Sequence, residues 1–409
     1  MNSACKKILW VSSDILHPLN KGGRLRTFGI LHSLSKRHDI VYIGLNQDST
    51  EQDIKLASEY CSRLVAHEIS DANFSAIKRL YQLADSLFKQ LPYSVYRLQS
   101  KPFLENVIAE LGTKTYDLLI CDFVHSGINI PDQLNVPMVL FQHNAEAHLW
   151  QRRADSEKKF GFKSLYRFQA RLMRSFEERI VKKAKSVICV SPNDRDITIQ
   201  YYGGLDVASI PTGVDVDYFG SVERNPRIEP TLVFTGSLDW EPNSEGIFWF
   251  VEKVFPLVKR LVPACRVSIV GRNPSNALLG LAHRTPGVEL LGRVPDVRPY
   301  LAIAHVAIVP ILTGGGTRMK IFESFSAGLP VVSTTIGAEG LQVTNDQDIF
   351  LRDDPETFAE AILNLINDRQ LADRIGKNAR ALVFENFSGP RVAEEFEKLC
   401  FPSEFDRVV

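Results

Sequence analysis

The stretch HVAIVPILTGGGTRMKIFESFSAGLPVVSTT, from His305 to Thr335, contains the pattern that decides the fold. It begins with a short apolar run, HVAIVPIL, and passes through three consecutive glycines into a segment of helical length. It ends in a second apolar run, LPVVSTT. Short, continuously apolar runs separated by helices are typical of parallel strands that are buried on both faces. The stretch therefore predicts a strand, a helix and a second strand parallel to the first.

Runs of the same kind recur along the whole chain, and this repetition predicts an α/β protein. In the first half they are KKILWVSS, HDIVYIGL, YDLLICDF, VPMVLFQHN, KSVICVSP and VASIPTG; in the second half they are TLVFTGSLDW, RVSIVGR, GVELLGR, HVAIVPIL, LPVVSTT and DIFLRDD. The pattern restarts near Thr231, after SVERNPRIEP, a polar stretch with two prolines that we interpret as a linker.

We therefore predict two doubly wound, Rossmann-like domains that face a cleft. The first spans residues 1–220 and the second residues 221–389, and a helix at 390–409 packs back toward the first domain. Ligands are expected at the carboxyl ends of the strands and in the cleft between the domains.

The bulk composition is that of an ordinary globular protein. The chain has 409 residues, too many for one typical core, and its formal net charge is +0, which does not favour nucleic acid as a partner. The six cysteines are scattered, and no stretch approaches the roughly 20 apolar residues of a membrane span. We expect a cytoplasmic protein.

The three glycines at 314–316 precede a predicted helix, TRMKIFESFSAG, with Thr317 as its N-cap. Gly328 and Pro330 suit the end of this helix. The backbone N–H groups of Gly315, Gly316 and Thr317, together with the helix dipole, form an anion site. These three residues are therefore expected to bind a phosphorylated ligand.

Three charged side chains accompany this anion site. Arg318 and Lys320 add positive charge, and Lys320 and Glu323 share a face because they are three residues apart. Such a group suits a nucleotide sugar, since cations hold phosphates and a carboxylate accepts hydrogen bonds from sugar hydroxyls. The alternative is a flexible loop followed by a surface ion pair.

Each half of the chain begins with a strand that runs into glycine-bearing turns. Gly22 and Gly23 follow the first strand of the first half, and Gly236 follows the first strand of the second half. Neither turn contains G-x-G-x-x-G, so the dinucleotide fingerprint is absent. These glycines are candidates for donor binding, and a plain turn remains the alternative.

The order of motifs resembles that of a known enzyme family. VFTGSLDWEPNSEG, VSIVGRNP, GVELLGRVPDVRPYLAIAHVAIVPIL and GGGTRMKIFESFSAGLPVVSTTIGAEGL resemble the nucleotide-sugar-binding domain of the retaining GT-B glycosyltransferases of family 4. HNAE and VICVSPND…IPTGVDVDYF look like the family's first domain. The resemblance implies transfer of a sugar from a nucleotide-diphosphate donor to a hydroxyl acceptor, with retention of configuration, in envelope or secreted polysaccharide or other glycoconjugate synthesis.

The resemblance also implies roles for single residues, with two departures. Glu323 matches the second of two family glutamates and implies a contact to the donor ribose, whereas the first falls on Gly315. The family's diphosphate-binding arginine falls on Ser237, and its lysine is missing. Arg318 and Lys320 could supply this charge instead, as a subgroup with GGGTRxKxxE would use them.

Other positions carry weaker assignments. The resemblance places backbone near Val294 against the nucleobase and His143 near the sugar. Arg272, Arg293 and the loop at Gly22 and Arg24 are further candidates for the diphosphate site.

Two local patterns suggest other partners. Asp215 and Asp217 form D-x-D, but they lie in a turn that resembles one just before the interdomain connection, so we expect neither a metal ion nor another cofactor. The segment from Gln151 to Lys185 is basic with interleaved aromatic residues. It is either a solvated helix face or a surface that docks on anionic membrane and a lipid-linked acceptor; no nucleic-acid module is recognisable.

Two other functions remain open. A nucleotide-sugar-binding protein without catalysis would explain the missing carboxylate at Gly315 and the serine at 237. A nucleotide-sugar epimerase of the same fold would interconvert donors without an acceptor.

Overall fold

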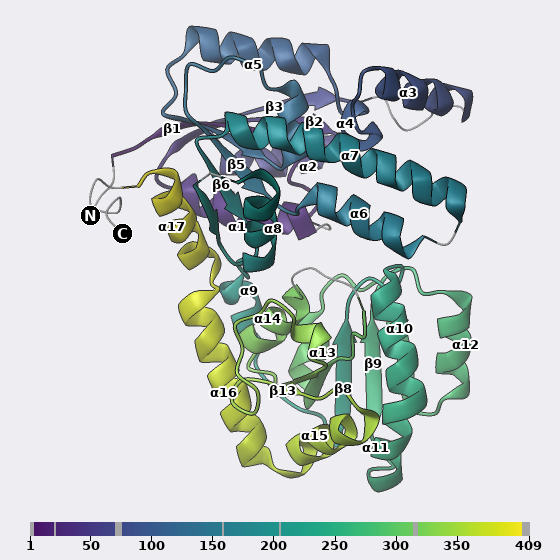
Figure 1. Cartoon of the computed structure of the whole chain (residues 1–409). Coiled ribbons are helices and arrows are strands. Elements are labelled where there is room, and N and C mark those ends of the chain that lie inside the picture. Colours follow the sequence, from purple (N-terminus) through teal and green to yellow (C-terminus); the bar gives the residue numbers. More distant parts are fainter. Residues whose placement is uncertain are drawn as a thin grey trace. The chain divides into compact units, whose positions relative to one another are not determined.

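The computed structural model describes residues 4–19, 22–69, 76–157, 159–203, 206–313 and 318–402. Contacts within the chain divide it into two compact units. Unit 1 comprises Met1–Pro211 and Val392–Val409, and unit 2 comprises Thr212–Arg391. Each unit contains one parallel sheet with helices on both faces (Figure 1), which confirms the predicted doubly wound α/β architecture.

The sheet of unit 1 has the strand order β3-β2-β1-β4-β5-β6-β7. Its strands are β1 (Lys7–Ser12), β2 (Asp39–Asn46), β3 (Arg63–Glu68), β4 (Leu118–Asp122), β5 (Met138–Gln142), β6 (Ser186–Cys189) and β7 (Val207–Ser209). All six apolar runs of the first half form strands. The sequence analysis missed β3, an edge strand whose residues are only partly buried.

Alternate side chains of the unit 1 strands enter two cores, one on each face of the sheet. In β1, Leu9 and Val11 join the core that contains Phe176 of α7, whereas Ile8 and Trp10 join the opposite core. The helices are α1 (Gly22–Leu34), α2 (Glu51–Ala57), α3 (Ala76–Phe88), α4 (Tyr93–Tyr96), α5 (Lys101–Thr113), α6 (Glu146–Ser156), α7 (Phe160–Lys183) and α8 (Pro192–Tyr202), with short 3₁₀ turns η1 (Ser58–Tyr60) and η2 (Val124–Asn129).

The C-terminal helix α17 (Gly389–Cys400) contributes to the core of unit 1. The Phe396 ring lies 5.9 Å from the Trp10 ring and 5.1 Å from the Phe141 ring, measured between centroids. Burial of these aromatic groups stabilises the helix on the sheet.

The sheet of unit 2 has the order β10-β9-β8-β11-β12-β13. Its strands are β8 (Thr231–Thr235), β9 (Arg266–Val270), β10 (Val288–Gly292), β11 (Val306–Val309), β12 (Val331–Ser333) and β13 (Phe350–Leu351). Its helices are α9 (Val216–Gly220), α10 (Glu241–Trp249), the π-helical η3 (Phe250–Val254), α11 (Phe255–Leu261), α12 (Asn276–Arg284), α13 (Arg298–Ile303), α14 (Met319–Ser326), the 3₁₀ turn η4 (Ile336–Ala338), α15 (Pro355–Asn367) and α16 (Arg369–Asn386).

Residues 212–230 lie in unit 2, including the segment interpreted from sequence as a linker. Arg224 in this segment donates hydrogen bonds to the carbonyls of Gly328 and Ala304, at 3.0 and 2.9 Å. These bonds fasten the polar segment to the body of unit 2, where it covers helix ends instead of spanning solvent.

Strand order reverses once in each unit, between β1 and β4 in unit 1 and between β8 and β11 in unit 2. In open parallel sheets, ligands bind outside the carboxyl ends of the strands at such a reversal.

Candidate active site

In unit 2, Lys320 of α14 lies against the loop that follows β8. Its Nζ donates a hydrogen bond of 2.8 Å to Oδ1 of Asn243, and Asn243 Nδ2 donates to the Ser237 carbonyl at 2.7 Å. The same Nζ lies 4.0 Å from the centroid of the Phe234 ring. Gly236 leaves room for this arrangement, since a Cβ at residue 236 would lie 2.6 Å from Nζ. Its φ of +151° is also a conformation that side-chain-bearing residues rarely adopt.

Two cationic side chains, Arg318 and Lys320, lie close together here. Burial, with repulsion from Arg318, lowers the pKa of Lys320 to about 7, although Glu323 acts in the opposite direction. Arg318 is buried, its guanidinium lies 4.8 Å from the Trp240 ring, and burial lowers its pKa as well. An anion bound beside these groups would restore the charged form of Lys320.

Glu323 lies one helical turn after Lys320, as the spacing predicts. Its carboxylate makes no hydrogen bond or ion pair to a described residue, and burial raises its pKa to about 7, opposed by Lys320. Phe322 and Phe325 of the same helix are buried in the core of unit 2. The helix is therefore held by its apolar face, and its polar face carries the two titratable groups.

The start of this helix differs from the prediction. The helix begins at Met319 with Arg318 in the N-cap position in place of Thr317, and no side chain caps it. Gly315, Gly316 and Thr317 lie outside the described residues. Gly328 ends the helix with a φ of +64°, a left-handed conformation that favours glycine.

The remaining candidates of unit 2 follow strands β9 and β10. Arg272 Nε donates a hydrogen bond of 3.0 Å to Ser237 Oγ, which brings a guanidinium to the loop that holds Lys320. Val294 follows β10 and is partly buried. The structure thus brings Gly236, Arg318, Lys320, Glu323 and Arg272 to the carboxyl side of one sheet.

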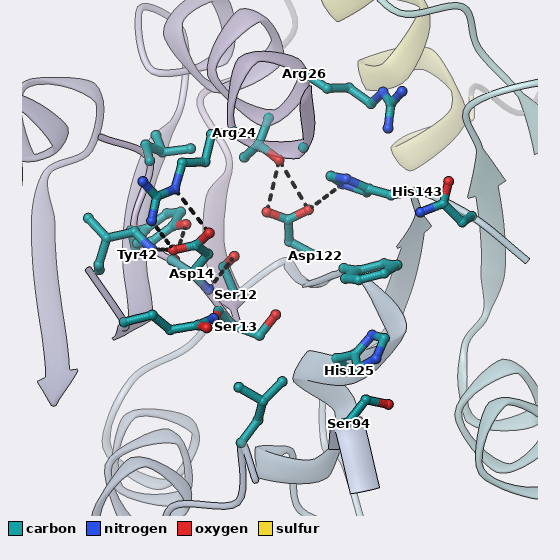
Figure 2. Close-up of a pocket in the computed structure, with 18 of the residues that line it drawn as sticks. Ser12, Ser13, Asp14, Arg24, Arg26, Tyr42, Ser94, Asp122, His125 and His143 are labelled. Carbon is teal, nitrogen blue, oxygen red and sulfur yellow. Dashed lines mark hydrogen bonds and ion pairs between the residues drawn. The ribbon is translucent and has the colours of Figure 1, made fainter. Parts of the chain in front are cut away.

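In unit 1, a cavity of about 410 Å³ lies at the carboxyl ends of β1 and β4 (Figure 2). Its lining includes Ser12 at the end of β1 and Asp14 after it, Gly23 and Arg26 of α1, and His143 after β5. Arg24 also lines it and pairs with Asp14, whose Oδ1 lies 2.5 Å from Nη2, and with Asp48. The cavity lining therefore already carries organised ion pairs.

His143 is buried and bonded to Asp122, the last residue of β4. The distance from His143 Nε2 to Asp122 Oδ1 is 2.8 Å. Burial lowers the pKa of His143, opposed by Asp122 and assisted by Arg26. At neutral pH the imidazole is therefore uncharged, and a neutral ring has one nitrogen that can accept a hydrogen bond from a hydroxyl.

The glycine turn of unit 1 also reaches His143. A Cβ on Gly23 would lie 3.3 Å from His143 Nδ1, whereas a Cβ on Gly22 would meet nothing within 4 Å. Of these two candidates, Gly23 is the one whose missing side chain leaves space at the imidazole.

A strained residue separates two histidines in the cavity. Phe123 has a φ of +70°, which costs a bulky residue about 1–3 kcal/mol. Its ring lies 4.5 Å from that of His125 and 5.4 Å from that of His143. Burial lowers the pKa of His125 to about 4. Such strain persists only where the surroundings enforce it, and it is common at functional sites.

Sequence reasoning missed Asp122 and Asn243. Asp122 is the one charged residue in the apolar run YDLLICDF that stands at the carboxyl end of the strand, and that position was the available signal. Asn243 sits in the segment EPNSEG, where nothing distinguishes it from an ordinary helix-start residue.

Asp215 of the D-x-D pair has a structural role. Asp215 caps α9 by accepting a hydrogen bond of 2.9 Å from the Tyr218 amide. In the described part of the chain, no group of three or more His, Cys, Asp or Glu side chains could hold a metal ion. None of the described helices is both long and apolar enough to cross a membrane.

Two relatives cover different shares of the chain. A protein named as uncharacterised, of 44.6 kDa, in the cps region of Klebsiella pneumoniae is 23% identical over 402 residues, which cover 94% of this chain and 97% of that protein. The Escherichia coli UDP-Gal:alpha-D-GlcNAc-diphosphoundecaprenol alpha-1,3-galactosyltransferase is 25% identical, over 56% of this chain and 63% of that enzyme.

A third relative, the phosphatidyl-myo-inositol mannosyltransferase of Mycobacterium tuberculosis, is 31% identical over 41% of this chain and 44% of that enzyme. The chain thus aligns with less than two thirds of the length of the galactosyltransferase and of the mannosyltransferase.

Solved structures share the fold over nearly the whole chain. HepE of Anabaena, in complex with UDP and glucose, superimposes with a TM-score of 0.64 at 15% identity, covering 96% of this chain and 98% of that one. The sucrose-phosphate synthase of Thermosynechococcus elongatus gives 0.68 at 18% identity, with the same coverage.

Two family descriptions match the two parts of the sequence. Residues 32–218 match Glycosyltransferase Family 4, and residues 229–368 match Glycosyl transferases group 1. The chain is a glycosyltransferase of the GT-B fold, with its family 4 domain first and its group 1 domain second.

Proposed function

We propose that this glycosyltransferase binds a nucleotide-diphosphate sugar in unit 2 and transfers the sugar, with retention of configuration, to a hydroxyl acceptor. The observation that carries the proposal is the position of Lys320, a half-buried residue whose amine is held between Asn243, Phe234 and Gly236. Such a preorganised cation gains most when negative charge develops beside it, and a departing diphosphate develops that charge.

The neighbouring groups have complementary tasks in this proposal. Arg318 adds charge beside Lys320, and Arg272 reaches the same loop through Ser237. The Glu323 carboxylate, which has no partner among the described residues, accepts hydrogen bonds from the donor ribose. Exchanging it for an amide, Glu323→Gln, should weaken donor binding while the fold is retained.

We assign the acceptor to the cavity of unit 1. Its carboxylates, hydroxyls and imidazoles offer hydrogen bonds to a hydroxyl-rich molecule. The names of the galactosyltransferase and mannosyltransferase relatives include lipid-linked molecules, and one relative lies in a cps region. These names support a lipid-linked acceptor and a role in envelope polysaccharide or glycoconjugate synthesis.

The tip of the α6–α7 hairpin supports contact with anionic membrane. The hairpin tip carries exposed apolar and basic residues: Arg152, Lys159, Phe160, Phe162, Arg167, Phe168 and Arg171. Phe160 is 85% exposed, and keeping an aromatic side chain in contact with water is unfavourable in free energy. Aromatic groups interleaved with cations suit the boundary of an anionic bilayer.

The basic residues at the other end of α7 are engaged within unit 1. Lys183 donates to the carbonyls of Ile130 and Pro131, and Lys182 pairs with Glu178 at 2.6 Å. Arg174 lies over the Tyr201 ring, with 4.4 Å between guanidinium carbon and centroid. The proposed membrane contact is therefore assigned to the hairpin tip alone.

The experiment that tests the function is a donor panel with the full chain. UDP-, GDP- and ADP-sugars are incubated with the protein and a bacterial lipid extract, with and without excess chelator, and released nucleoside diphosphate is measured. We expect release with one donor class, undiminished by chelator because Lys320 and Arg318 neutralise the leaving group.

Other outcomes point to the alternatives. Complete loss with chelator, restored by manganese or magnesium, would contradict metal independence. Donor binding without release favours a binding protein, and donor interconversion without an acceptor favours an epimerase.

A further inference from the structure

Three groups converge on the buried carboxylate of Asp122, and Figure 2 shows the one from His143. Trp10 Nε1 donates to Oδ2 at 3.1 Å, and Thr27 Oγ1 lies 3.0 Å from Oδ2 and 3.2 Å from Oδ1. His143 Nε2 lies 2.8 Å from Oδ1. An indole N–H can only donate, and an ionised carboxylate can only accept. With Asp122 present as a carboxylate, the contact at 2.8 Å therefore places a proton on His143 Nε2.

The proton on Nε2 decides the state of the other ring nitrogen. Burial and Arg26 keep the pKa of His143 low, so the ring carries one proton at neutral pH. With that proton on Nε2, Nδ1 presents a lone pair and acts as an acceptor. Nδ1 makes no hydrogen bond to a described residue.

The groups around the imidazole determine what Nδ1 can contact. Phe141 and Phe123 lie 4.7 and 5.4 Å from the imidazole, between ring centroids, so apolar groups flank it. On the Nδ1 side stands Gly23, whose missing side chain would lie 3.3 Å from the nitrogen. Gly23 and His143 both line the cavity of unit 1.

We propose that Asp122 is a positioning residue that fixes His143 as the Nε2–H tautomer, so that Nδ1 beside Gly23 accepts a hydrogen bond from a substrate hydroxyl. The inference rests on the proposed glycosyl transfer for the identity of that hydroxyl. The tautomer itself is a property of the protein without substrate, and its measurement is independent of turnover.

The first test is the ¹⁵N NMR spectrum of the full chain with labelled histidine at neutral pH. The His143 signals are assigned by their loss in His143→Asn. We expect a pyrrole-like Nε2 and a pyridine-like Nδ1. In Asp122→Asn, the amide oxygen accepts from Trp10 and the amide N–H₂ faces His143, so the two signals should exchange character. A wild-type ring protonated on Nδ1, or unchanged signals in Asp122→Asn, would overturn the inference.

The second test compares two replacements of His143 in the transfer assay. The amide of asparagine reaches the place of Nδ1, and the amide of glutamine reaches the place of Nε2. His143→Asn should retain more kcat/KM than His143→Gln, by about 10-fold, the effect of one hydrogen bond in a buried site. The reverse order would contradict a role for Nδ1, even if Asp122→Asn does not fold.

Gly23→Ala crowds Nδ1 without changing the imidazole, and Gly29→Ala on the same helix is the matched control, because its Cβ would meet nothing within 4 Å. We expect Gly23→Ala to lower kcat/KM while the tautomer stays as in wild type. Equal activity of the two alanine variants would overturn the placement of the hydroxyl beside Gly23. Failure of all variants and of wild type to turn over any donor would instead count against the proposed function, and the NMR result would stand.

Discussion

Gly236 and Lys320 illustrate how a missing side chain makes room for a charged one. The Lys320 amine fills the space that a Cβ at residue 236 would take, and Asn243 and Phe234 close the remaining sides. A compact ammonium fits this site, whereas a planar guanidinium would need to displace the loop.

Removal of the Lys320 amine should therefore damage catalysis. We expect Lys320→Ala to lower kcat by about 100-fold or more, since one preorganised charge-stabilising group contributes about 2.7–4 kcal/mol in the transition state. Lys320→Arg should restore little activity. Steady-state kinetics with the best donor measure both, and Lys377→Ala on the exposed face of α16 is the control. Near-normal kcat in a folded Lys320→Ala protein would contradict this role and would indicate that Arg318 and Arg272 stabilise the diphosphate instead.

Donor binding should also take up a proton. In the free protein the pKa of Lys320 is about 7, so at pH 8 the amine is mostly neutral; a bound diphosphate raises that pKa and recharges the amine. Affinity should thus fall as pH rises above 7. Glu323 would act in the opposite direction, because a carboxyl that ionises on donor binding releases a proton. Its pKa is also about 7, so the carboxyl is already mostly ionised at pH 8 and releases few protons.

Calorimetry at pH 8 in two buffers of different ionisation enthalpy measures the proton count. We expect uptake of up to about one proton by wild type and none by Lys320→Met. Net proton release by wild type would show that another group controls the site.

At the scale of residues, the sequence predicted those side chains whose spacing is local. Lys320 and Glu323 share a helix face because they are three apart, and Gly236 follows a recognisable strand. Asn243 and Asp122 were missed because their partners, Lys320 and His143, lie 77 and 21 residues away. Hydrogen bonds of this kind depend on how strands are ordered in a sheet, which local pattern does not reveal.

At the scale of elements, continuous apolar runs predicted strands reliably because buried parallel strands need apolar side chains on both faces. β3 was not predicted because it lies at the sheet edge, where most of its residues RLVAHE are only partly buried and form no continuous apolar run. The start of α14 was predicted from Thr317, yet the helix begins at Met319. Helix ends depend on backbone geometry in the preceding loop, and composition defines them poorly.

The α6–α7 hairpin is fixed to unit 1 at its base. Glu177 of α7 accepts hydrogen bonds from the Glu146 and Ala147 amides at the start of α6, at 3.0 and 3.1 Å. Near the tip, Arg153 of α6 lies 4.7 Å from the Tyr166 ring of α7. The two helices thus contact each other near the tip, where the phenylalanines are exposed.

We expect the protein to sediment with phosphatidylglycerol vesicles and not with phosphatidylcholine vesicles. Arg167→Gln with Arg171→Gln should weaken binding about 30-fold, at about 1 kcal/mol for each cation. Phe160→Ser with Phe162→Ser should weaken it as well, whereas Ile228→Ser, which removes an exposed apolar residue of unit 2, should not. Equal sedimentation with neutral and anionic vesicles would exclude this surface.

At the scale of the whole molecule, repetition of the strand–helix pattern predicted two α/β units. The junction is harder to locate from sequence. Residues 221–230 look like a linker because they are polar and contain two prolines, but the bonds of Arg224 to Gly328 and Ala304 are long-range and leave no local signature.

The most direct test of glycosyl transfer is the fate of the sugar itself. A donor labelled in its sugar is incubated with wild-type protein and a lipid extract, and both label in the lipid fraction and released nucleoside diphosphate are quantified. The account predicts one nucleoside diphosphate for each sugar transferred, and loss of both in Lys320→Ala. Label that remains with the nucleotide under every donor, despite measurable donor binding, would contradict it.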